Sequence, residues 1–256
     1  MATGADATKA AVLDVYIDPL SWDSAIGKII DWAERRESRY VCACNVHSIV
    51  TARTDTGLRR VLNDADMATP DGMPIAWSLR RLGFRSQARI NGPDLMWHVL
   101  ERAARAGLSV FFYGSSPETI AQLTSRTIAA FPRLRIAGSF SPPYRALTLD
   151  EDAAIVDRIN ASGASIAFIG LGCPKQERWM AEHRGKIKAV MLGVGAAFDY
   201  HAGTLKRAPH WMQRSGLEWA YRLGQEPGRL WRRYLTTNTL FAYYFARQIL
   251  ARTRRL

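Results

Sequence analysis

Short apolar runs alternate along this chain with segments in which apolar residues recur at the spacing of a helix. The runs predict buried strands at residues 11–17, 40–44, 67–69, 108–113, 134–138, 165–169 and 189–194. The segments between them predict helices at residues 22–36, from about 47, at 59–64, after 72 and through 80, at 95–106, from 117 and at 153–160. Strands that alternate with helices favour an α/β fold with a parallel, doubly wound sheet.

Polar and glycine residues follow several of the predicted strands. In an open parallel sheet the carboxyl ends of the strands meet at one edge, and ligands bind at that edge. Five positions end a strand or follow one: Asn45, Asp71, Gly114, Gly170 and Asp199. We therefore expect the functional site at this edge of the sheet.

The segment at 168–177 combines a strand end, a tight turn and the start of a helix. Gly170 and Gly172 allow the backbone to approach a ligand closely. Pro174 suits the first turn of a helix, where a backbone N–H is not needed. The free N–H groups there, with Lys175 beside them, would suit a phosphate. A tight connection that binds no ligand is the alternative interpretation.

After residue 203 the pattern changes to aromatic and basic residues with no predicted strand. From residue 201 to the end, eleven Lys or Arg stand against two Glu, so this fifth of the chain holds nine of the twelve net positive charges. We divide the chain into a sheet domain at 1–203 and a helical appendage at 204–256. A basic appendage indicates an anionic partner. The pattern leaves three interpretations: a helical cap on the sheet, a nucleic-acid surface, or a surface for an anionic membrane.

Composition narrows the class of protein. The start of the chain lacks a signal-peptide pattern, and the run at 235–246 is shorter than the about 20 residues of a membrane-spanning helix. Three cysteines fit a reducing compartment, and we expect Cys42 and Cys44 to be buried apolar residues and not metal ligands. Asp64 and Asp66 form a D-x-D motif, which binds a metal in many sugar transferases but arises often by chance.

Seven separated blocks together resemble one family. They are C-N-V-H at 44–47, T-P-D-G-M-P at 69–74, R-I-N-G-P-D-L at 89–95, G-L-G-C-P-K-Q-E at 170–177, G-V-G-A-A-F-D at 193–199, R-A-P-H-W at 207–211, and G-L-E-W at 216–219 with Y-R-L at 221–223. In order and spacing they are similar to the bacterial WecG/TagA/CpsF glycosyltransferases. The similarity begins at about residue 10 and covers nearly the whole chain.

The resemblance implies a Rossmann-like catalytic domain and an inverting transfer from a UDP-sugar to a saccharide linked to polyprenyl pyrophosphate. It implies no metal and no other cofactor. It also implies that the appendage docks on the anionic cytoplasmic face of the bacterial inner membrane, as a peripheral protein, and completes the active site. The membrane and cap interpretations are thereby favoured together over nucleic acid. The oligomeric state stays open, a homo-oligomer included.

The resemblance further implies roles for individual residues. Asp71 matches the family's proposed base, which takes the proton of the acceptor hydroxyl. The structural alternative for Asp71 is an N-cap of the following helix. Arginines would stabilise the departing UDP, and the matching active-site residues are Arg89, Arg222, Arg229, Arg232 and Gln176. Those expected near UDP or the sugar are Asn45, Tyr113, Gly114, Gly170, Gly172, Lys175, Asp199 and Arg207.

The appendage arginines lie seven and three residues apart, which would place them on one helical face. Pro227 and Gly228 stand between them and argue against an unbroken helix.

One departure from the family pattern bears on the donor. Ala43 stands where many members have a threonine whose hydroxyl is expected to contact substrate. The sequences N-V-H at 45–47 and G-M-P-I-A-W at 72–77 are also more similar to members that build exopolysaccharides. Together with Ala43 they favour a glucosyl donor and exopolysaccharide biosynthesis. The alternative within the family is an N-acetylmannosamine or N-acetylmannosaminuronate donor. The alternative from another class is a nucleotide- or RNA-binding protein that uses the basic appendage without chemistry.

Overall fold

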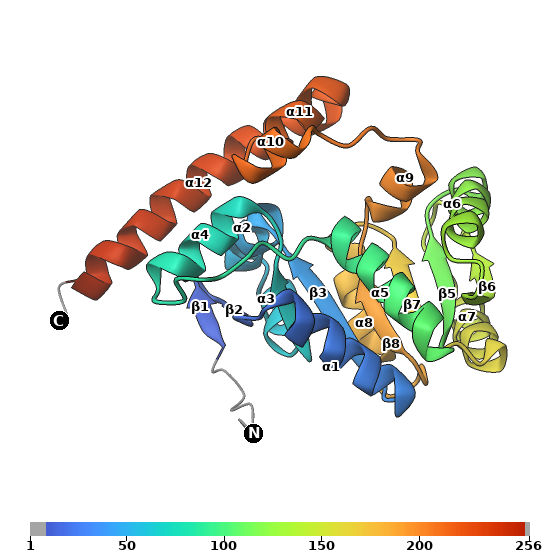
Figure 1. The fold of residues 1–256 in the computed structure, drawn as a ribbon. Coiled ribbons are helices and arrows are strands. Elements are labelled where there is room, and N and C mark those ends of the chain that lie inside the picture. The colour runs from blue at the N-terminus through green and yellow to red at the C-terminus, as the bar shows by residue number, and fades with distance from the viewer. Residues whose placement is uncertain (1–8, 254–256) are drawn as a thin grey trace.

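A six-stranded parallel sheet lies at the centre of the computed structural model, which describes residues 9–253 (Figure 1). Its strands are β3 (Arg39–Cys44), β4 (Met67–Pro70), β5 (Ser109–Gly114), β6 (Arg135–Phe140), β7 (Ile166–Gly170) and β8 (Val190–Gly193). Their order across the sheet is β4-β3-β8-β7-β5-β6, and every neighbouring pair is parallel. This is the parallel α/β sheet that the alternation of strands and helices predicts, and it is Rossmann-like, as the resemblance implies.

Helices cover both faces of the sheet. One face packs against α1 (Trp22–Glu34), α5 (Gly92–Ala106), α6 (Pro117–Ala130) and α9 (Ala197–Ala202). The other packs against α2 (Val46–Thr54), α3 (Thr56–Asn63), α7 (Leu149–Ser162) and α8 (Lys175–His183). Each face of the sheet has its own hydrophobic core, and successive side chains of a strand point to opposite faces. In β5, Phe112 points into the core on the first face and Phe111 into the core on the second. Burial on both faces explains why the strands read as continuous apolar runs.

The helix starts follow the expected capping chemistry. Ser21 caps α1 by accepting a hydrogen bond from the backbone of Ser24, and Ser116 caps α6 in the same way. Cys42 and Cys44 are fully buried in strand β3, as expected.

The single strand predicted at 11–17 is wrong. The structure has a two-stranded antiparallel hairpin there, β1 (Ala10–Val12) and β2 (Val15–Ile17). The reversal occurs at Leu13, whose φ of 56° is left-handed, followed by Asp14. In each strand of the hairpin, buried and exposed residues alternate. Two short strands therefore give nearly the same sequence pattern as one long strand.

The chain after Gly203 contributes helices α10 (His210–Arg214), α11 (Glu218–Gln225) and α12 (Pro227–Thr253). The break between α11 and α12 falls at Glu226, where Pro227 and Gly228 argue against an unbroken helix. Long helix α12 lies across α2, and its own Leu230 and Phe241 are buried. None of the helices in residues 9–253 is long and apolar enough to cross a membrane.

Short helix α4 (Met73–Arg81) completes the architecture. It follows β4 and contacts β1 and β4, so it lies beyond the β4 edge of the sheet and beneath α12. The strand ends of β4 and β3 therefore open into a space that has α4 on one side and α11 and α12 above.

Candidate functional site

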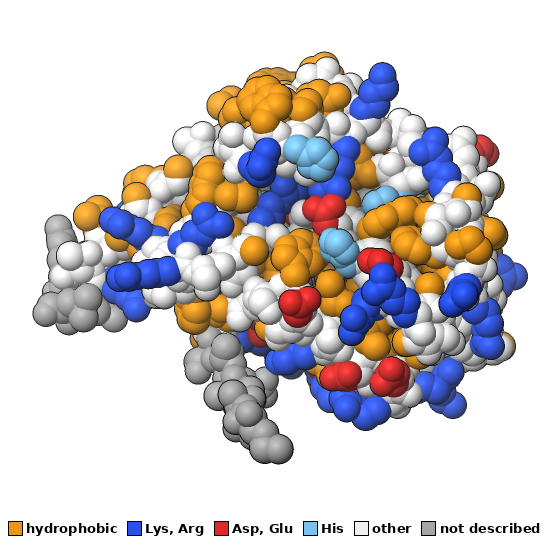
Figure 2. All heavy atoms as spheres, viewed as in Figure 1, with side chains coloured by type: hydrophobic (Ala, Val, Ile, Leu, Met, Phe, Trp, Pro, Cys, Tyr) orange, Lys and Arg blue, Asp and Glu red, His pale blue; other side chains and the backbone are white. Residues whose placement is uncertain are grey.

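The carboxyl ends of the strands gather the residues that the sequence singles out. Asn45 follows β3, Asp71 follows β4, Gly114 and Gly170 end β5 and β7, and Asp199 lies in α9 after β8. Because β4, β3 and β8 are neighbours, Asn45 and Asp71 come together at one end of this edge. Figure 2 shows acidic and basic side chains side by side in the hollow beneath the appendage helices.

Asp71 is held in place by its backbone. Its N–H donates to the carbonyl oxygens of Cys44, at 2.9 Å, and Thr69, at 3.0 Å, which fixes it to the ends of both strands. The next residue, Gly72, has a φ of 91° and serves as the N-cap of α4 without any side-chain hydrogen bond. The N-cap alternative for Asp71 is therefore wrong, because its carboxylate does not cap the helix.

The surroundings of Asp71 raise the pKa of its carboxyl to about 6. Burial is the main cause, since a low-dielectric site disfavours the charged form. Arg89, the Asn45 side chain and Arg222 lower the pKa, whereas the carboxylate of Glu218 raises it. The balance leaves a carboxylate that is ionised at neutral pH and basic enough to accept a proton.

Asn45 joins the start of α2 to the site. Its side-chain oxygen accepts from the backbone N–H of Ser48 at 3.1 Å, and the Ser48 hydroxyl accepts from the Asn45 backbone N–H at 2.9 Å. This capping box uses the oxygen of the amide. The NH₂ group therefore faces the Asp71 carboxylate, whose pKa it lowers.

Arg89 and Glu218 connect the sheet domain to the appendage. The Arg89 guanidinium donates to the Glu218 carboxylate, and both side chains are largely buried. The Nε atom of Arg89 is buried without a partner among the described residues. The backbone N–H of Ile90 donates to the Pro70 carbonyl at 3.0 Å, which places the Arg89 loop directly beside Asp71.

Further arginines reach the cleft from α11 and α12. Arg222 and Arg229 pair with Glu226 at 3.6 Å and 3.0 Å, and both lower the pKa of Asp199, which burial raises. Arg222 also lies over the ring of Tyr200. Two arginines from the break between the helices thus face an acidic residue that follows β8.

The loop between β7 and α8 lies at the same carboxyl edge of the sheet, next to the end of β5. Gly114 and Gly170 are cross-strand partners so close that a Cβ on Gly114 would meet the Gly170 backbone at 2.6 Å. Helix α8 starts at Lys175, which is exposed, and its N-terminus carries no side-chain cap. The N–H of Gln176 in this first turn already donates to the Gly172 carbonyl at 2.9 Å, so the start of α8 is partly satisfied from within the loop, and the phosphate interpretation of the segment stays a prediction.

Gln176 is buried beneath this loop. Its Oε1 accepts from the Gly172 N–H at 3.2 Å, and its NH₂ donates to Glu177 at 3.0 Å. It also packs against Gly193 and Gly195. In this structure Gln176 therefore holds the shape of the loop from below.

Comparison with known proteins identifies the family. The sequence profile of the glycosyl transferase WecG/TagA/CpsF family matches residues 10–255. The chain belongs to the WecG/TagA/CpsF glycosyltransferases. It is 33% identical over 223 residues, 84% of each chain, to an N-acetylglucosaminyldiphosphoundecaprenol N-acetyl-beta-D-mannosaminyltransferase of Bacillus spizizenii. The resemblance drawn from the seven blocks is confirmed, and the protein is a glycosyltransferase.

Besides Gln176, three more of the residues matched to WecG/TagA/CpsF positions lie outside the cleft or are already bonded to other residues. The Tyr113 side chain is buried against Phe140 and Trp179, and burial raises its pKa, so only its backbone leads to the site. Arg207 forms a two-point ion pair with Asp94 and ties the appendage to α5. Arg232 is exposed, over the ring of Trp231.

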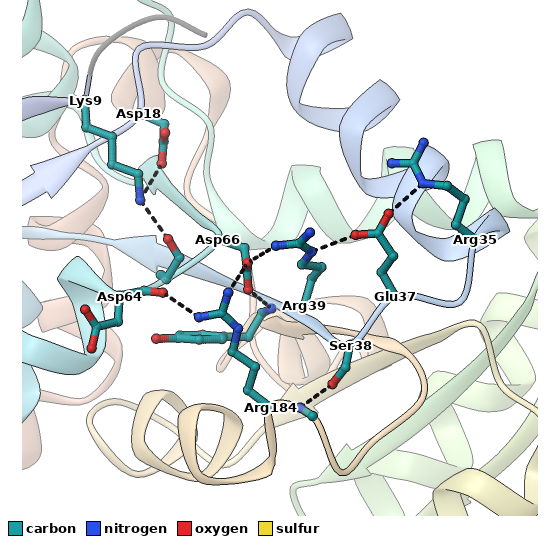
Figure 3. Close-up of polar contacts among 12 residues, drawn as sticks. Lys9, Asp18, Arg35, Glu37, Ser38, Arg39, Asp64, Asp66 and Arg184 are labelled. Carbon is teal, nitrogen blue, oxygen red and sulfur yellow. Dashed lines mark hydrogen bonds and ion pairs between the residues drawn. The ribbon is translucent and has the colours of Figure 1, made fainter.

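The D-x-D motif of this glycosyltransferase lies at the opposite end of the sheet. Asp66 precedes β4 and accepts from Arg39 and Arg184, each at 2.7 Å, and from the Tyr40 backbone at 3.0 Å (Figure 3). Its carboxylate is thus neutralised far from Asp71. Among residues 9–253 no group of three or more His, Cys, Asp or Glu is arranged to hold a metal ion.

Two residues at the site were missed in the sequence. Glu218 belongs to the G-L-E-W block, but its contact with Arg89 spans 129 positions, and no local pattern encodes it. Arg233 is largely buried, its Nε has no hydrogen-bond partner within residues 9–253, and its charge acts on Cys173 in the loop after β7 and on His47. Its spacing of four from Arg229 was the available signal, because i and i+4 share a helical face.

Proposed function

We propose that this glycosyltransferase moves a hexosyl group from a UDP-sugar to a saccharide linked to polyprenyl diphosphate, with inversion at the anomeric carbon. The observation that carries the proposal is the Asp71 carboxylate, with a pKa of about 6, beside Arg89 and Arg222 at the carboxyl edge. The name of the Bacillus spizizenii relative, which acts on a diphosphoundecaprenol-linked sugar, supports a lipid-linked acceptor.

In the proposed reaction Asp71 is the base. The acceptor hydroxyl oxygen attacks the anomeric carbon from the face opposite the diphosphate, the bond from that carbon to UDP breaks, and Asp71 takes the hydroxyl proton. A pKa near 6 keeps the carboxylate ionised at neutral pH while it remains a competent acceptor in the transition state. Arg89, through its charge, and Asn45, through a side-chain hydrogen bond, favour the ionised carboxylate.

The leaving UDP gathers negative charge that must be stabilised. Arg222 and Arg229 at the helix break supply permanent positive charge, and the exposed Lys175 at the start of α8 adds a further cation. A guanidinium is suited to a diphosphate because its fork binds two oxygens at once. In this proposal these groups do the work that a metal does in other sugar transferases.

We place the protein at the cytoplasmic face of the bacterial inner membrane, as a peripheral protein docked through the appendage. Exposed aromatic and apolar side chains accompany the arginines there: Trp211, Leu217, Trp219, Trp231, Leu235, Tyr243 and Leu250. Figure 2 shows apolar side chains over α10 and α11 and basic side chains along α12. This combination suits the headgroup region of an anionic bilayer.

For the donor we propose UDP-glucose, in exopolysaccharide biosynthesis, because of Ala43. Ala43 is partly exposed at the end of β3, and its partner across the strands, Thr69, has a buried hydroxyl with no described partner. A threonine at position 43 would bring a second hydroxyl to this spot. The relative transfers an N-acetylmannosaminyl group, so this sugar and its uronate are the competing donors.

The test is UDP release by the full-length protein with UDP-glucose, UDP-N-acetylmannosamine, UDP-N-acetylmannosaminuronate and UDP-N-acetylglucosamine. Each donor is run with EDTA and detergent, with and without a polyprenyl-diphosphate-linked saccharide. We expect acceptor-dependent release from one donor, and Ala43→Thr is expected to shift the ratio of kcat/KM values between donors. No release with any pair, together with RNA binding that weakens steeply with salt, would favour the non-catalytic alternative.

A further inference from the structure

An apolar groove separates α4 from the second half of α12. Its volume is about 620 Å³, within the range of roughly 300–1,000 Å³ that is usual for ligand sites. Its walls include Pro74, Trp77 and Arg81 from α4, and Phe241, Phe245 and Leu250 from α12. It is distinct from the cleft around Asp71, and nothing in the proposed chemistry uses it.

The groove leaves large apolar side chains open to solvent. Trp77 is 45% exposed and Leu250 is 62% exposed, although both line the same depression. Among residues 9–253 the lining contains no carboxylate, and its charged residue is Arg81, which is exposed. An apolar surface of this kind beside a positive charge is suited to an apolar ligand that carries or accompanies negative charge.

One end of the groove lies at the proposed active site. Helix α4 begins two residues after Asp71, and Pro74 in the wall of the groove is three residues after Asp71. Trp77 packs beneath Gly216, where an added Cβ would meet its ring at 2.7 Å, and Gly216 is two residues before Glu218. Helix α12 starts just after the cleft arginine Arg222. Both helices therefore run away from the site, side by side (Figure 1).

We propose that this groove binds the first isoprene units of the acceptor's polyprenyl chain; the inference rests on the proposed function. A saccharide at Asp71 carries its diphosphate on the reducing sugar, and the chain beyond the diphosphate needs an apolar path from the site to the bilayer. From Phe241 to Leu250 the wall is about 14 Å long, at about 1.5 Å per residue. The rest of the chain enters the membrane at the far end.

Charge favours a lipid over a second copy of the protein. Arg81 lies in the groove, and Arg247 and Arg252 lie on the same part of α12. A symmetric dimer through this face would bring the same basic residues towards one another. An anionic prenyl diphosphate or an anionic leaflet is complementary to them instead.

The test is direct binding of farnesyl diphosphate, a soluble isoprenoid diphosphate, compared with inorganic diphosphate by calorimetry. Ala246→Trp fills the groove with bulk, and Ala242→Asp places a carboxylate in it. Ala251→Trp is the matched control, because Ala251 is exposed on α12 but is outside the lining. We expect farnesyl diphosphate to bind at least about tenfold more tightly than diphosphate, since each buried CH₂ adds about 0.8 kcal/mol. Each groove variant should abolish that advantage, and the control should keep it.

Equal affinity for the two probes, or an unchanged farnesyl advantage in a folded groove variant, would overturn the proposal. So would loss of a dimer in Ala246→Trp without any change in farnesyl binding, which would assign the groove to a second copy. Because binding needs no sugar transfer, failure of every UDP-sugar would reject the proposed function and leave this test valid. Conversely, transfer with one KM for acceptors with and without an isoprenoid chain would reject the groove alone.

Discussion

Replacement of Asp71 by asparagine is expected to make the protein more stable and far less active. The carboxyl has a pKa of about 6 in the folded protein, against an ordinary value of 3.8. The folded state therefore binds more protons than the unfolded state between these values, and stability falls as the pH rises from about 4 to about 6. Above pH 6 the ionised carboxylate costs the fold about 3 kcal/mol, at 1.36 kcal/mol per pKa unit.

Asparagine keeps the shape of the side chain and removes this cost. Since Asp71 is partly accessible to solvent, a gain of about 1–3 kcal/mol at pH 7.5 is the expected range. That gain corresponds to about 2–4 °C in the melting temperature for each kcal/mol in a chain of this size. At pH 4 the wild-type carboxyl is protonated in the folded protein, so the gain should vanish. Loss of a general base should lower turnover by about 10²–10⁴-fold.

The assay is urea unfolding and UDP release of Asp71→Asn and wild type at pH 7.5, with unfolding repeated at pH 4. Asp157→Asn is the matched control, because Asp157 is exposed on α7 and far from the cleft. Its stability should follow wild type at both pH values. A stability gain for Asp71→Asn that is equal at both pH values, or a loss at pH 7.5, would refute the electrostatic argument. Near-normal turnover would remove Asp71 from the role of base.

Three further predictions concern the appendage. Glu218→Gln removes the carboxylate that raises the pKa of Asp71, so the acid limb of the pH profile of kcat/KM should move below pH 6. An acid limb that stays in place would contradict the electrostatic coupling between Glu218 and Asp71. Arg233→Lys should lower kcat at least about tenfold, whereas Arg232→Lys should lower it only slightly, because Arg232 is exposed over Trp231. Equal effects of the two variants on kcat would speak against a role of the buried Arg233 in the reaction. Removal of residues after 203 should abolish both transfer and liposome binding, and a truncated protein with full turnover would reject the contribution of the appendage.

The sheet was predictable because its strands are buried on both sides. Such strands are uninterrupted apolar runs, as in β5 and β7, and the helices between them carry an apolar face with a capping serine. The hairpin at the start escaped prediction, because the left-handed turn at Leu13 has no glycine or asparagine to mark it. Local patterns therefore yield the order of elements more readily than an unusual backbone conformation.

The candidate site was predictable only where a residue follows a strand directly. Asn45 and Asp71 meet because the ends of β3 and β4 are neighbours, which the parallel sheet imposes. The rotation of α12 about its axis depends on packing against α2, and it decides that Arg233 turns inwards and Arg232 outwards. Tyr113 shows the same limit, since its place in an alternating strand sends the ring into the core.

If Asp71 is the base, the ion pair between Arg89 and Glu218 couples the proposed chemistry to the docking of α11 on the sheet domain. The two partners of the contact that fastens α11 to the sheet also act on the pKa of Asp71, which burial raises most: Arg89 lowers it and Glu218 raises it. When α11 lifts away, Asp71 loses the carboxylate that raises its pKa, and the cleft loses Arg222. The sheet domain alone would then hold a weaker base, and Arg89 would be left as the guanidinium beside it without Arg222 and Arg229. In this proposal, a protein whose appendage is not docked would hydrolyse the UDP-sugar slowly, so that the sugar would be kept for transfer to the acceptor.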